Sequence, residues 1–192
     1  MRRFVLASAS PRRKEILENA GFTFEIIVSD ADENITDSLT PSETVEELAK
    51  RKALAVWDKN KDAVVFGCDT VVAIDGKILG KPKDDDEAFS MIKMLSGRAH
   101  TVSTGVCICA ENKISVFSNI TEVEFYELSD ETIRSYIATG EGRDKAGSYG
   151  IQGYGCVLIK EIKGDYFSVM GLPVSQSARV LADFGVYGKV RV

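Results

Sequence analysis

The chain has 192 residues, a hydrophobic content of 44% and a formal net charge of −5 at pH 7. A chain of this size can bury one sizeable core or two small ones, and we predict a single domain over residues 1–192, in one or two lobes. The acidic balance excludes a general binder of nucleic acid polymers or anionic membranes, because no excess of cations is available to follow a polyanion. No apolar run approaches the roughly 20 residues that span a bilayer, and no secretory signal core follows Met1, so we expect a cytoplasmic protein.

The cysteines and the single histidine give little support to a metal site built on thiolates or imidazoles. Cys68, Cys107, Cys109 and Cys156 form no CxxC pair, and all lie in apolar runs where small buried residues are expected. His100 has no second histidine or acid paired with it nearby. We interpret it as a structural hydrogen-bonding residue.

The stretch 6–17, LASASPRRKEIL, predicts the end of a strand, a tight turn and the start of a helix. Ser10 suits the N-cap position and Pro11 the first helical position. Helix starts normally attract acids, yet three cations occupy positions 12–14 here. Free helix amides, serine hydroxyls and guanidinium groups at the end of a strand favour a phosphate-binding turn. A solvated basic first turn is the alternative.

An acidic segment, Ser29 to Ser38, follows a second predicted strand at Phe24 to Val28. It contains Asp30, Asp32 and Glu33. One interpretation is a solvated loop. The other is that one of these acids faces the basic turn, directly or through a metal ion, and composition does not choose between them.

A helix is predicted from Pro41 to about Asp58. Thr40 and Glu43 form a capping box at its start, and apolar residues recur at helical spacing along it. The cations at 50–52 spread around this helix, so most of them are expected in solvent. One of them can still point inward, toward a phosphate.

The run Ala63 to Ile74, AVVFGCDTVVAI, predicts a buried strand because it is apolar, β-branched and too short for a typical helix. Asp69 interrupts this run. An ionised carboxylate in apolar surroundings is costly unless it is paired or bound to a metal, so Asp69 needs a partner. We favour a catalytic or metal-binding acid over a structural hydrogen bond or a strand break.

The remaining sequence predicts a mixed sheet with an antiparallel hairpin of two long strands. A polar, glycine-rich passage at 144–155, DKAGSYGIQGYG, either allows close approach of the backbone to a ligand or forms an unadorned loop. Pro82 stiffens the backbone beside Lys81 and can aim that lysine. The other predicted elements are a turn at Asp75-Gly76, a helix from Asp85 to Leu95, the long strands Ala99 to Ala110 and Lys113 to Glu127, a helix from Asp130 to Ala138, a last hairpin of strands Cys156 to Ile162 and Tyr166 to Val169, and a helix from Pro173 to Phe184.

Six sequence blocks cover almost the full chain: SASPRR at 8–13, CDTVV at 68–72, GKP at 80–82, SGRAHTVSTGV at 96–106, DKAGSYGIQG at 144–153 and GDYFSVMGLP at 164–173. In this order they resemble the Maf family of nucleoside triphosphate pyrophosphatases. The resemblance implies an α/β fold with a mixed, elongated sheet flanked by helices, two lobes and a central cleft, related to the inosine triphosphate pyrophosphatases. It also implies a divalent metal cation, Mg²⁺ or Mn²⁺, and a possible homodimer. Some members of the family are associated with septum formation. No residue or motif of this sequence predicts that role.

Within the family, the GIQG that ends at Gly153 looks like the branch that acts on dTTP and UTP. The branch that acts on 7-methyl-GTP has a different sequence after the DKAG block. Carried over residue by residue, Asp69 matches the proposed proton acceptor. Positions linked to substrate choice match Arg12, Thr70 and Gln152. The other polar cleft positions of the family match Ser8, Arg13, Glu33, Lys52 and Lys81, with Asp32 as the alternative to Glu33.

The resemblance and the residues imply one reaction, cleavage of a triphosphate between its α and β phosphates to give a nucleoside monophosphate and pyrophosphate. The cations expected to bind the phosphates are Arg12, Arg13, Lys52 and Lys81. Glu33 and Asp69 are expected to hold the metal, and Asp69 or a hydroxide bound there prepares the attacking water. The amide of Gln152 can both donate to and accept from the edge of uracil or thymine.

Two other functions stay open at this point. The first is a pyrophosphatase of the same fold for a modified purine nucleotide, of the 7-methyl-GTP or inosine type. The second is a nucleotide-binding regulator of cell division with no useful turnover. Asp69 argues against the second, because a protein that only binds nucleotides gains nothing from a buried base beside phosphate-seeking cations.

Overall fold

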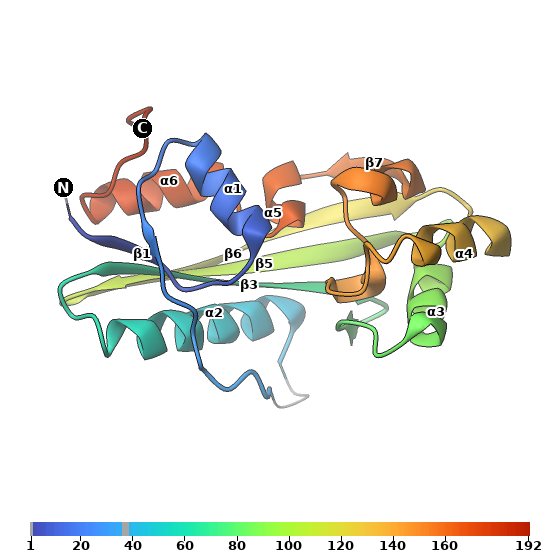
Figure 1. Ribbon diagram of the computed structural model, residues 1–192, viewed down its shortest axis with the longest axis horizontal. Helices are drawn as coiled ribbons and strands as arrows, with labels where there is room; N and C mark the ends of the chain where they lie inside the picture. Colours follow the sequence, from blue (N-terminus) through green and yellow to red (C-terminus); the bar gives the residue numbers. More distant parts are fainter. Residues whose placement is uncertain (1, 36–38) are drawn as a thin grey trace.

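Three long strands, β3 (Val64–Ile74), β5 (Ala99–Ala110) and β6 (Lys113–Phe125), run along most of the molecule (Figure 1). The computed structural model describes residues 2–35 and 39–192. Its sheet has the order β2-β1-β3-β5-β6-β7, and β4 (Lys77–Leu79) also pairs with β3. β1 (Phe4–Leu6) runs parallel to both β2 (Glu25–Ile26) and β3, and the other pairs are antiparallel. The sheet is therefore mixed, as predicted.

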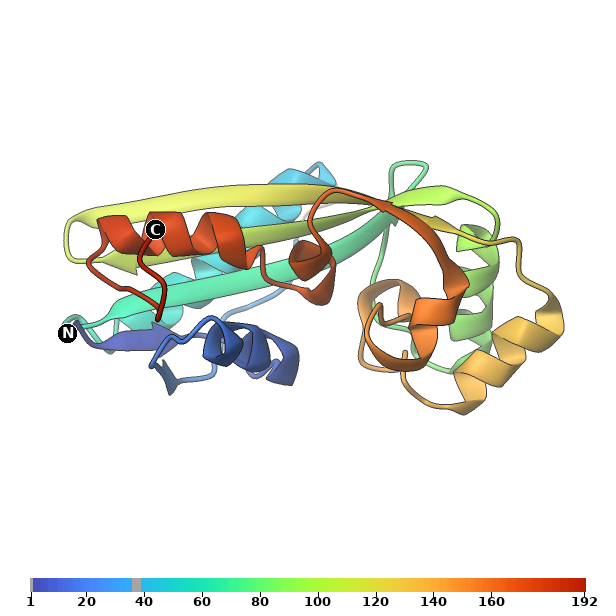
Figure 2. The same ribbon diagram turned by 90° about the horizontal axis from the view of Figure 1, so that it is seen from above.

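Helices cover both faces of the sheet. α2 (Pro41–Trp57) lies on one face, and α1 (Pro11–Asn19), α5 (Tyr166–Met170) and α6 (Val174–Asp183) lie on the other (Figure 1). α3 (Asp85–Leu95), α4 (Asp130–Ala138) and the 3₁₀ turns η1 (Ala146–Ser148) and η2 (Gly153–Leu158) gather at one end of the strands (Figure 2). Among the described residues, no helix is both long enough and apolar enough to cross a membrane.

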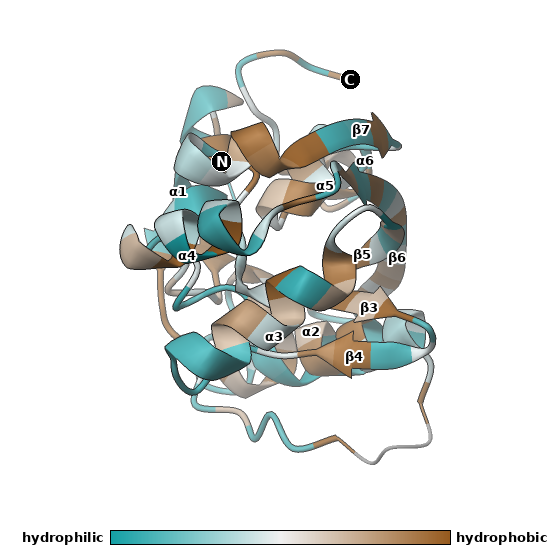
Figure 3. Cartoon of the chain, turned by 90° about the vertical axis from the view of Figure 1, so that its right-hand side faces the viewer, coloured by the Kyte–Doolittle hydropathy of each residue, from teal (hydrophilic) through white to brown (hydrophobic). Residues whose placement is uncertain are grey.

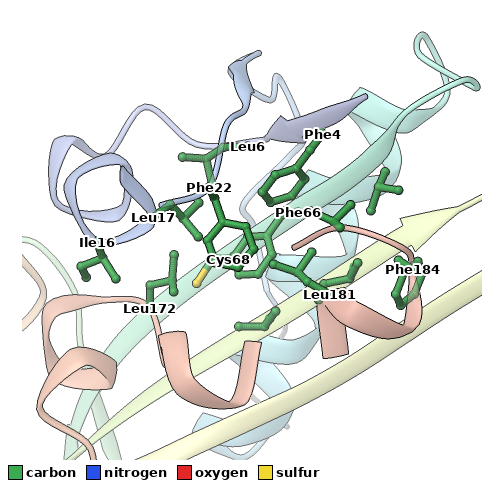
Figure 4. Packing of buried hydrophobic residues seen from close by; sticks show 14 of the residues in the cluster. Phe4, Leu6, Ile16, Leu17, Phe22, Phe66, Cys68, Leu172, Leu181 and Phe184 are labelled. Atoms are coloured by element: carbon green, nitrogen blue, oxygen red, sulfur yellow. The ribbon is translucent and has the colours of Figure 1, made fainter. Parts of the chain in front are cut away.

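Separate hydrophobic cores lie toward the two ends of the long strands. At the amino-terminal end of β3, one core packs Phe4, Phe66 and Leu181 between the sheet and helices α1 and α6 (Figure 4). At the other end, Val72, Ile92 and Phe125 belong to a second core beneath α3 and α4. Figure 3 shows hydrophilic and hydrophobic residues side by side on these two helices, as expected for helices with one buried face.

α2 packs unusually close to the sheet because two glycines face it. A Cβ atom on Gly67 of β3 would collide with the main chain of Ala49, and one on Gly105 of β5 would collide with the main chain of Val45. Since these contacts involve backbone atoms, they fix the height of α2 above the two strands. This close seat brings the side chains of α2 to the middle of β3.

Local sequence signals located most elements correctly. The N-caps at Ser10, Thr40, Asp84 and Ser129 are all present, and Thr40 and Glu43 form the predicted capping box. The second strand is shorter than predicted and covers only Glu25–Ile26. Of the predicted acidic segment, residues 36–38 lie outside the described residues.

The predicted last hairpin is wrong. Only β7 (Ile159–Lys163) is a strand, and it pairs with β6. The expected second strand is the helix α5, because Asp165 accepts a hydrogen bond from the Phe167 amide as its N-cap and Gly171 ends it in a left-handed conformation. Cys156 lies in η2 and is exposed, so the expectation that every cysteine is buried is also wrong.

Candidate active site

A cleft of about 630 Å³ lies beside β3, where the sheet has a gap. β1 pairs with Val64–Phe66 and β4 pairs with Val72–Ile74 on the same side of β3. Between these pairings, residues 67–71 of β3 have no strand beside them on that side in the described part of the chain. Asp69 lies at the centre of this open edge. It is the only acid of β3, and its residue lines the cleft.

All the residues that the sequence predicted for a site line this one cleft. They come from the basic turn, the acidic loop, α2, β3, the segment after β4 and the glycine-rich passage: Ser8, Arg12, Arg13, Glu33, Lys52, Asp69, Thr70, Lys81 and Gln152. The fold thus brings together positions that are up to about 140 residues apart in the chain. The role of each residue stays a prediction. The contacts that each side chain makes differ from one residue to the next.

Lys52 is the partner that the half-buried Asp69 needs. Its Nζ lies 2.6 Å from Oδ1 of Asp69 and 3.0 Å from Oε1 of Glu33. The side chains of Lys52 and Asp69 are each 13% exposed, whereas that of Glu33 is 65% exposed. A single ammonium group therefore balances two carboxylates, one of them mostly withdrawn from solvent.

The acidic loop is held in place by the neighbour of Lys52 on α2. Arg51 donates to the main-chain oxygens of Asp32 and Asn34, and it also pairs with Glu47. The carboxylate of Asp32 accepts from Asn34 within the loop, while Glu33 reaches Lys52. The structure therefore favours Glu33 over Asp32 as the loop acid of the cleft.

The carboxylates of Glu33 and Asp69 suit a hard divalent cation. Mg²⁺ in proteins is typically bound by one or two carboxylates together with substrate phosphates and water. Within residues 2–35 and 39–192, no group of three histidine, cysteine, aspartate or glutamate side chains is placed to hold a metal. The donor set therefore fits such an ion when a polyphosphate supplies the remaining oxygens.

The two arginines of the basic turn have different environments. Arg13 donates to four protein oxygens: the carbonyls of Gly171 at 2.8 Å and Cys68 at 2.8 Å, and the hydroxyls of Ser8 at 3.0 Å and Thr70 at 3.1 Å. Arg12 has a looser contact, 3.8 Å from a carboxylate oxygen of Asp144. Arg13 thus joins the turn to β3 and α5, while Arg12, among the described residues, has only this looser contact and can turn its donors toward a ligand.

The hydroxyl of Thr70 belongs to the same network as Arg13. Thr104 donates to the main-chain oxygen of Ser168 at 2.8 Å, so its oxygen accepts from Thr70, 2.9 Å away. Thr70 in turn accepts from Arg13. Since the single hydroxyl proton of Thr70 is already used, this residue can only accept a hydrogen bond from a ligand. Thr104 was not assigned to the site from the sequence. Its position within the SGRAHTVSTGV block could have indicated it.

The thiol beside Asp69 is not a nucleophile. Cys68 is fully buried, its Sγ lies 3.1 Å from the carbonyl oxygen of Gly171, and burial raises its pKa to about 11. A neutral thiol facing away from the cleft does not compete with Asp69 for a chemical role.

The glycine-rich passage forms the opposite wall of the cleft. It contributes Gln152, and also Lys145, a cation that sequence reasoning did not assign. Lys145 donates to the main-chain oxygen of Glu141 and lies 2.8 Å from a carboxylate oxygen of Asp144. The position of Lys145 within the DKAG block could have indicated that it belongs to the site.

His100 supports this wall from behind. Its Nε2 lies 2.8 Å from the phenol oxygen of Tyr149, which lines the cleft, and its ring packs edge-on against Phe125. Burial lowers the pKa of His100 to about 4, so the imidazole is neutral at physiological pH. The predicted structural, hydrogen-bonding role is confirmed.

A family model described as Maf-like protein matches residues 3–184. The chain belongs to this family. This Maf-like protein is 52% identical to a dTTP/UTP pyrophosphatase of Bacillus pumilus (strain SAFR-032), over 97% of this chain and 98% of the relative. It is 51% identical to a dTTP/UTP pyrophosphatase of Bacillus cereus (strain ZK / E33L), over 97% of each chain.

One solved structure extends the comparison to the fold. The Staphylococcus aureus Ham1 protein superposes with a TM-score of 0.52 and 17% sequence identity, over 82% of this chain and 79% of that one. At this identity the likeness concerns the fold alone. It confirms the predicted fold class, a mixed α/β fold with helices on both faces of the sheet.

Proposed function

We propose that this Maf-like protein is a nucleoside triphosphate pyrophosphatase that hydrolyses dTTP and UTP to the nucleoside monophosphate and pyrophosphate. The observation that carries the proposal is the open edge of β3, where Asp69 lies in a cleft lined by several cations. The names of the relatives at about half identity support the same substrates. A regulator that only binds nucleotides would not need this half-buried carboxylate.

Asp69 is the proposed proton acceptor. In the reaction, water attacks the α-phosphorus, the bond from that phosphorus to the bridging oxygen breaks, and pyrophosphate leaves with the bond electrons. The proton of the water passes to the carboxylate of Asp69. Lys52 orients this carboxylate before the attack, because its ammonium group lies 2.6 Å from Oδ1.

The cations of the cleft are proposed to bind the triphosphate, which carries about four negative charges. Arg12, Lys81 and Lys145 line the cleft from three different segments. Arg13 supports these cations by holding the basic turn in place. Its guanidinium group already donates to protein oxygens, so it is not fully available to the phosphates.

A divalent cation, Mg²⁺ or Mn²⁺, is the proposed cofactor, with Glu33 and Asp69 as the protein ligands. When bound, such an ion neutralises phosphate charge and lowers the pKa of bound water. The side chain of Glu33 is mostly exposed and that of Asp69 mostly withdrawn from solvent, and both carboxylates contact Nζ of Lys52.

Gln152 is proposed to choose the base. Uracil and thymine present a ring N–H flanked by two carbonyl groups, to which one side-chain amide can both donate and accept. Cytosine presents an acceptor in place of that N–H, so the carbonyl of Gln152 would face a lone pair. An opposed buried polar group costs about 1–3 kcal/mol, enough for roughly 5-fold to 150-fold discrimination.

The test is pyrophosphate release from a panel of nucleotides, each with Mg²⁺, with Mn²⁺ and with a chelator. We expect dTTP and UTP to be hydrolysed clearly better than dCTP and CTP, and all turnover to stop with the chelator. Preference for 7-methyl-GTP or ITP would favour the modified-purine alternative. Nucleotide binding without any pyrophosphate release would favour the regulator.

Two further predictions from the sequence belong with this proposal. We propose a cytoplasmic enzyme, consistent with nucleotides as substrates, and a possible homodimer. Sedimentation of the purified chain at micromolar concentration distinguishes a monomer of 21.0 kDa from a dimer of twice that mass.

A further inference from the structure

Glu141 lies behind the cleft wall, and its carboxylate is directed at the glycine-rich loop. Oε2 accepts from the main-chain amide of Tyr154 at 2.6 Å, and Oε1 accepts from the amide of Gly155 at 3.1 Å. Oε1 also accepts from the phenol of Tyr136, 3.2 Å away. A carboxylate that accepts three hydrogen bonds is a strong and directional anchor for a loop.

Tyr136 extends this anchor to the other end of the loop. Its phenol oxygen accepts from the amide of Gly150 at 3.0 Å while its hydroxyl proton goes to Glu141. Both ends of the segment 150–155 are thus tied to one carboxylate and one phenol. Gln152 lies between these attachment points and lines the cleft.

The glycines of the loop allow it to wrap this closely around the carboxylate. A Cβ atom on Gly153, which has φ +81°, would lie 2.6 Å from Oε2 of Glu141, and one on Gly150 would lie 3.0 Å from Oε1. Side chains at these positions would push the loop away from its anchor. The glycines therefore have a structural partner in Glu141 as well as a ligand-facing role.

We propose that Glu141 is a positioning residue for base selection, which sets the orientation of Gln152 by holding one end of the 150–155 loop directly and the other end through Tyr136. The proposal rests on the proposed function, in which Gln152 reads uracil or thymine. Glu141 is not among the residues that line the cleft, and its carboxylate contacts the loop and Tyr136, so the effect of this side chain on a bound base passes through the loop.

Glu141→Gln is the diagnostic substitution because it keeps size and shape. Each carboxylate oxygen accepts from a main-chain amide, so the new amide NH₂ must face an N–H donor at one of the two positions. One hydrogen bond becomes a repulsion, and that end of the loop is released. Tyr136→Phe is the second variant, since it leaves the Gly150 amide without its acceptor.

The experiment measures kcat/KM for UTP and for CTP in the wild type, Glu141→Gln, Tyr136→Phe and the control Glu131→Gln, an exposed acid on α4. We expect the UTP to CTP ratio to fall by about fivefold or more in Glu141→Gln, and by less in Tyr136→Phe. The control keeps the wild-type ratio. If Glu141→Gln does not fold, the ratio in Tyr136→Phe decides.

A Gln152→Ala background separates positioning from general damage. If Glu141 acts through Gln152, Glu141→Gln changes the ratio in the wild-type background and leaves it unchanged when Gln152 is absent. An unchanged ratio in the single variants, or the same fall in both backgrounds, overturns the inference. A wild type without UTP turnover contradicts the proposed function itself, whereas a selective wild type with unaffected variants contradicts the inference alone.

Discussion

Lys52 Nζ lies 2.6 Å from Oδ1 of Asp69, and the two side chains reach each other from α2 and from the open edge of β3. The acid of the strand is therefore neither solvated nor isolated. Its partner is the ammonium group of Lys52, which contacts Oδ1.

The first prediction concerns Asp69→Asn, which keeps the shape of the side chain and removes its charge. Turnover should fall by about 10²-fold or more, because the proton acceptor is lost, while nucleotide binding survives. Pyrophosphate release and nucleotide titration measure the two effects. Asp75→Asn is the control, since Asp75 begins the turn after β3 and pairs with Arg98 at the surface. Wild-type turnover in Asp69→Asn would contradict the assignment.

The two arginines of the basic turn should respond differently to replacement by alanine. Arg12→Ala should weaken triphosphate binding by about 1.5–3 kcal/mol, the contribution of a charged hydrogen bond, with little change in the melting temperature. Arg13→Ala should lower the melting temperature by several degrees, because four buried or half-buried oxygens lose their donor. Thermal melts without ligand separate the two. Equal melting temperatures would show that Arg13 does not hold the turn.

His100 predicts a specific loss of stability in acid. Burial lowers its folded-state pKa to about 4, whereas an unfolded histidine titrates near 6.5. As the pH falls from about 6.5 to 4, the unfolded chain takes up the proton first, so stability present above this window is lost within it. Between pH 7 and pH 5 the wild type should lose about 2 kcal/mol more than His100→Gln. Urea unfolding at both pH values measures this, and equal losses would contradict it.

Gly105→Ala tests the close seat of α2. The new methyl group would meet the backbone of Val45 and lie 2.7 Å from the amide nitrogen of Glu46, neither of which can turn aside. We expect a loss of about 1–3 kcal/mol in unfolding free energy and a fall in turnover, because Lys52 moves with α2. Gly80→Ala is the matched control for stability, since a Cβ there has open space and no positive φ. Equal stability of the two variants would contradict the packing account.

The sequence predicted the elements best where the signal was local. N-caps such as Ser10 and Asp84 act within one helical turn, so a few residues were sufficient to place them. The segment 166–169 failed because its aromatic and β-branched residues favour a strand, while Asp165 as a cap and Gly171 as a terminator favour a helix. The weight of those two signals depends on the tertiary contacts of α5.

The candidate site was predictable in membership but not in detail. Asp69 stood out because a lone acid in an apolar strand requires a partner. The difference between Arg12 and Arg13 was not readable, because neighbours on a helix point about 100° apart and only the fold decides which one meets Thr70 and Gly171. The same holds for Lys52 and Arg51, of which one faces the cleft acid and the other ties down the loop.

The cores at the two ends of the long strands are joined by those strands rather than by a linker, and a third core packs between the sheet and α2. On β3, Cys68 belongs to the core beneath α1 and α6, and Val72 belongs to the core beneath α3 and α4. Asp69 is one of the three residues between them. The two ends of the molecule cannot swing apart without bending the sheet near Asp69. We therefore expect the segments that line the cleft, such as the glycine-rich passage, to move when a nucleotide enters or leaves. We also expect a substitution that loosens either core to disturb the position of Asp69. Mutations buried far from the cleft should reduce turnover at temperatures where the chain is still folded.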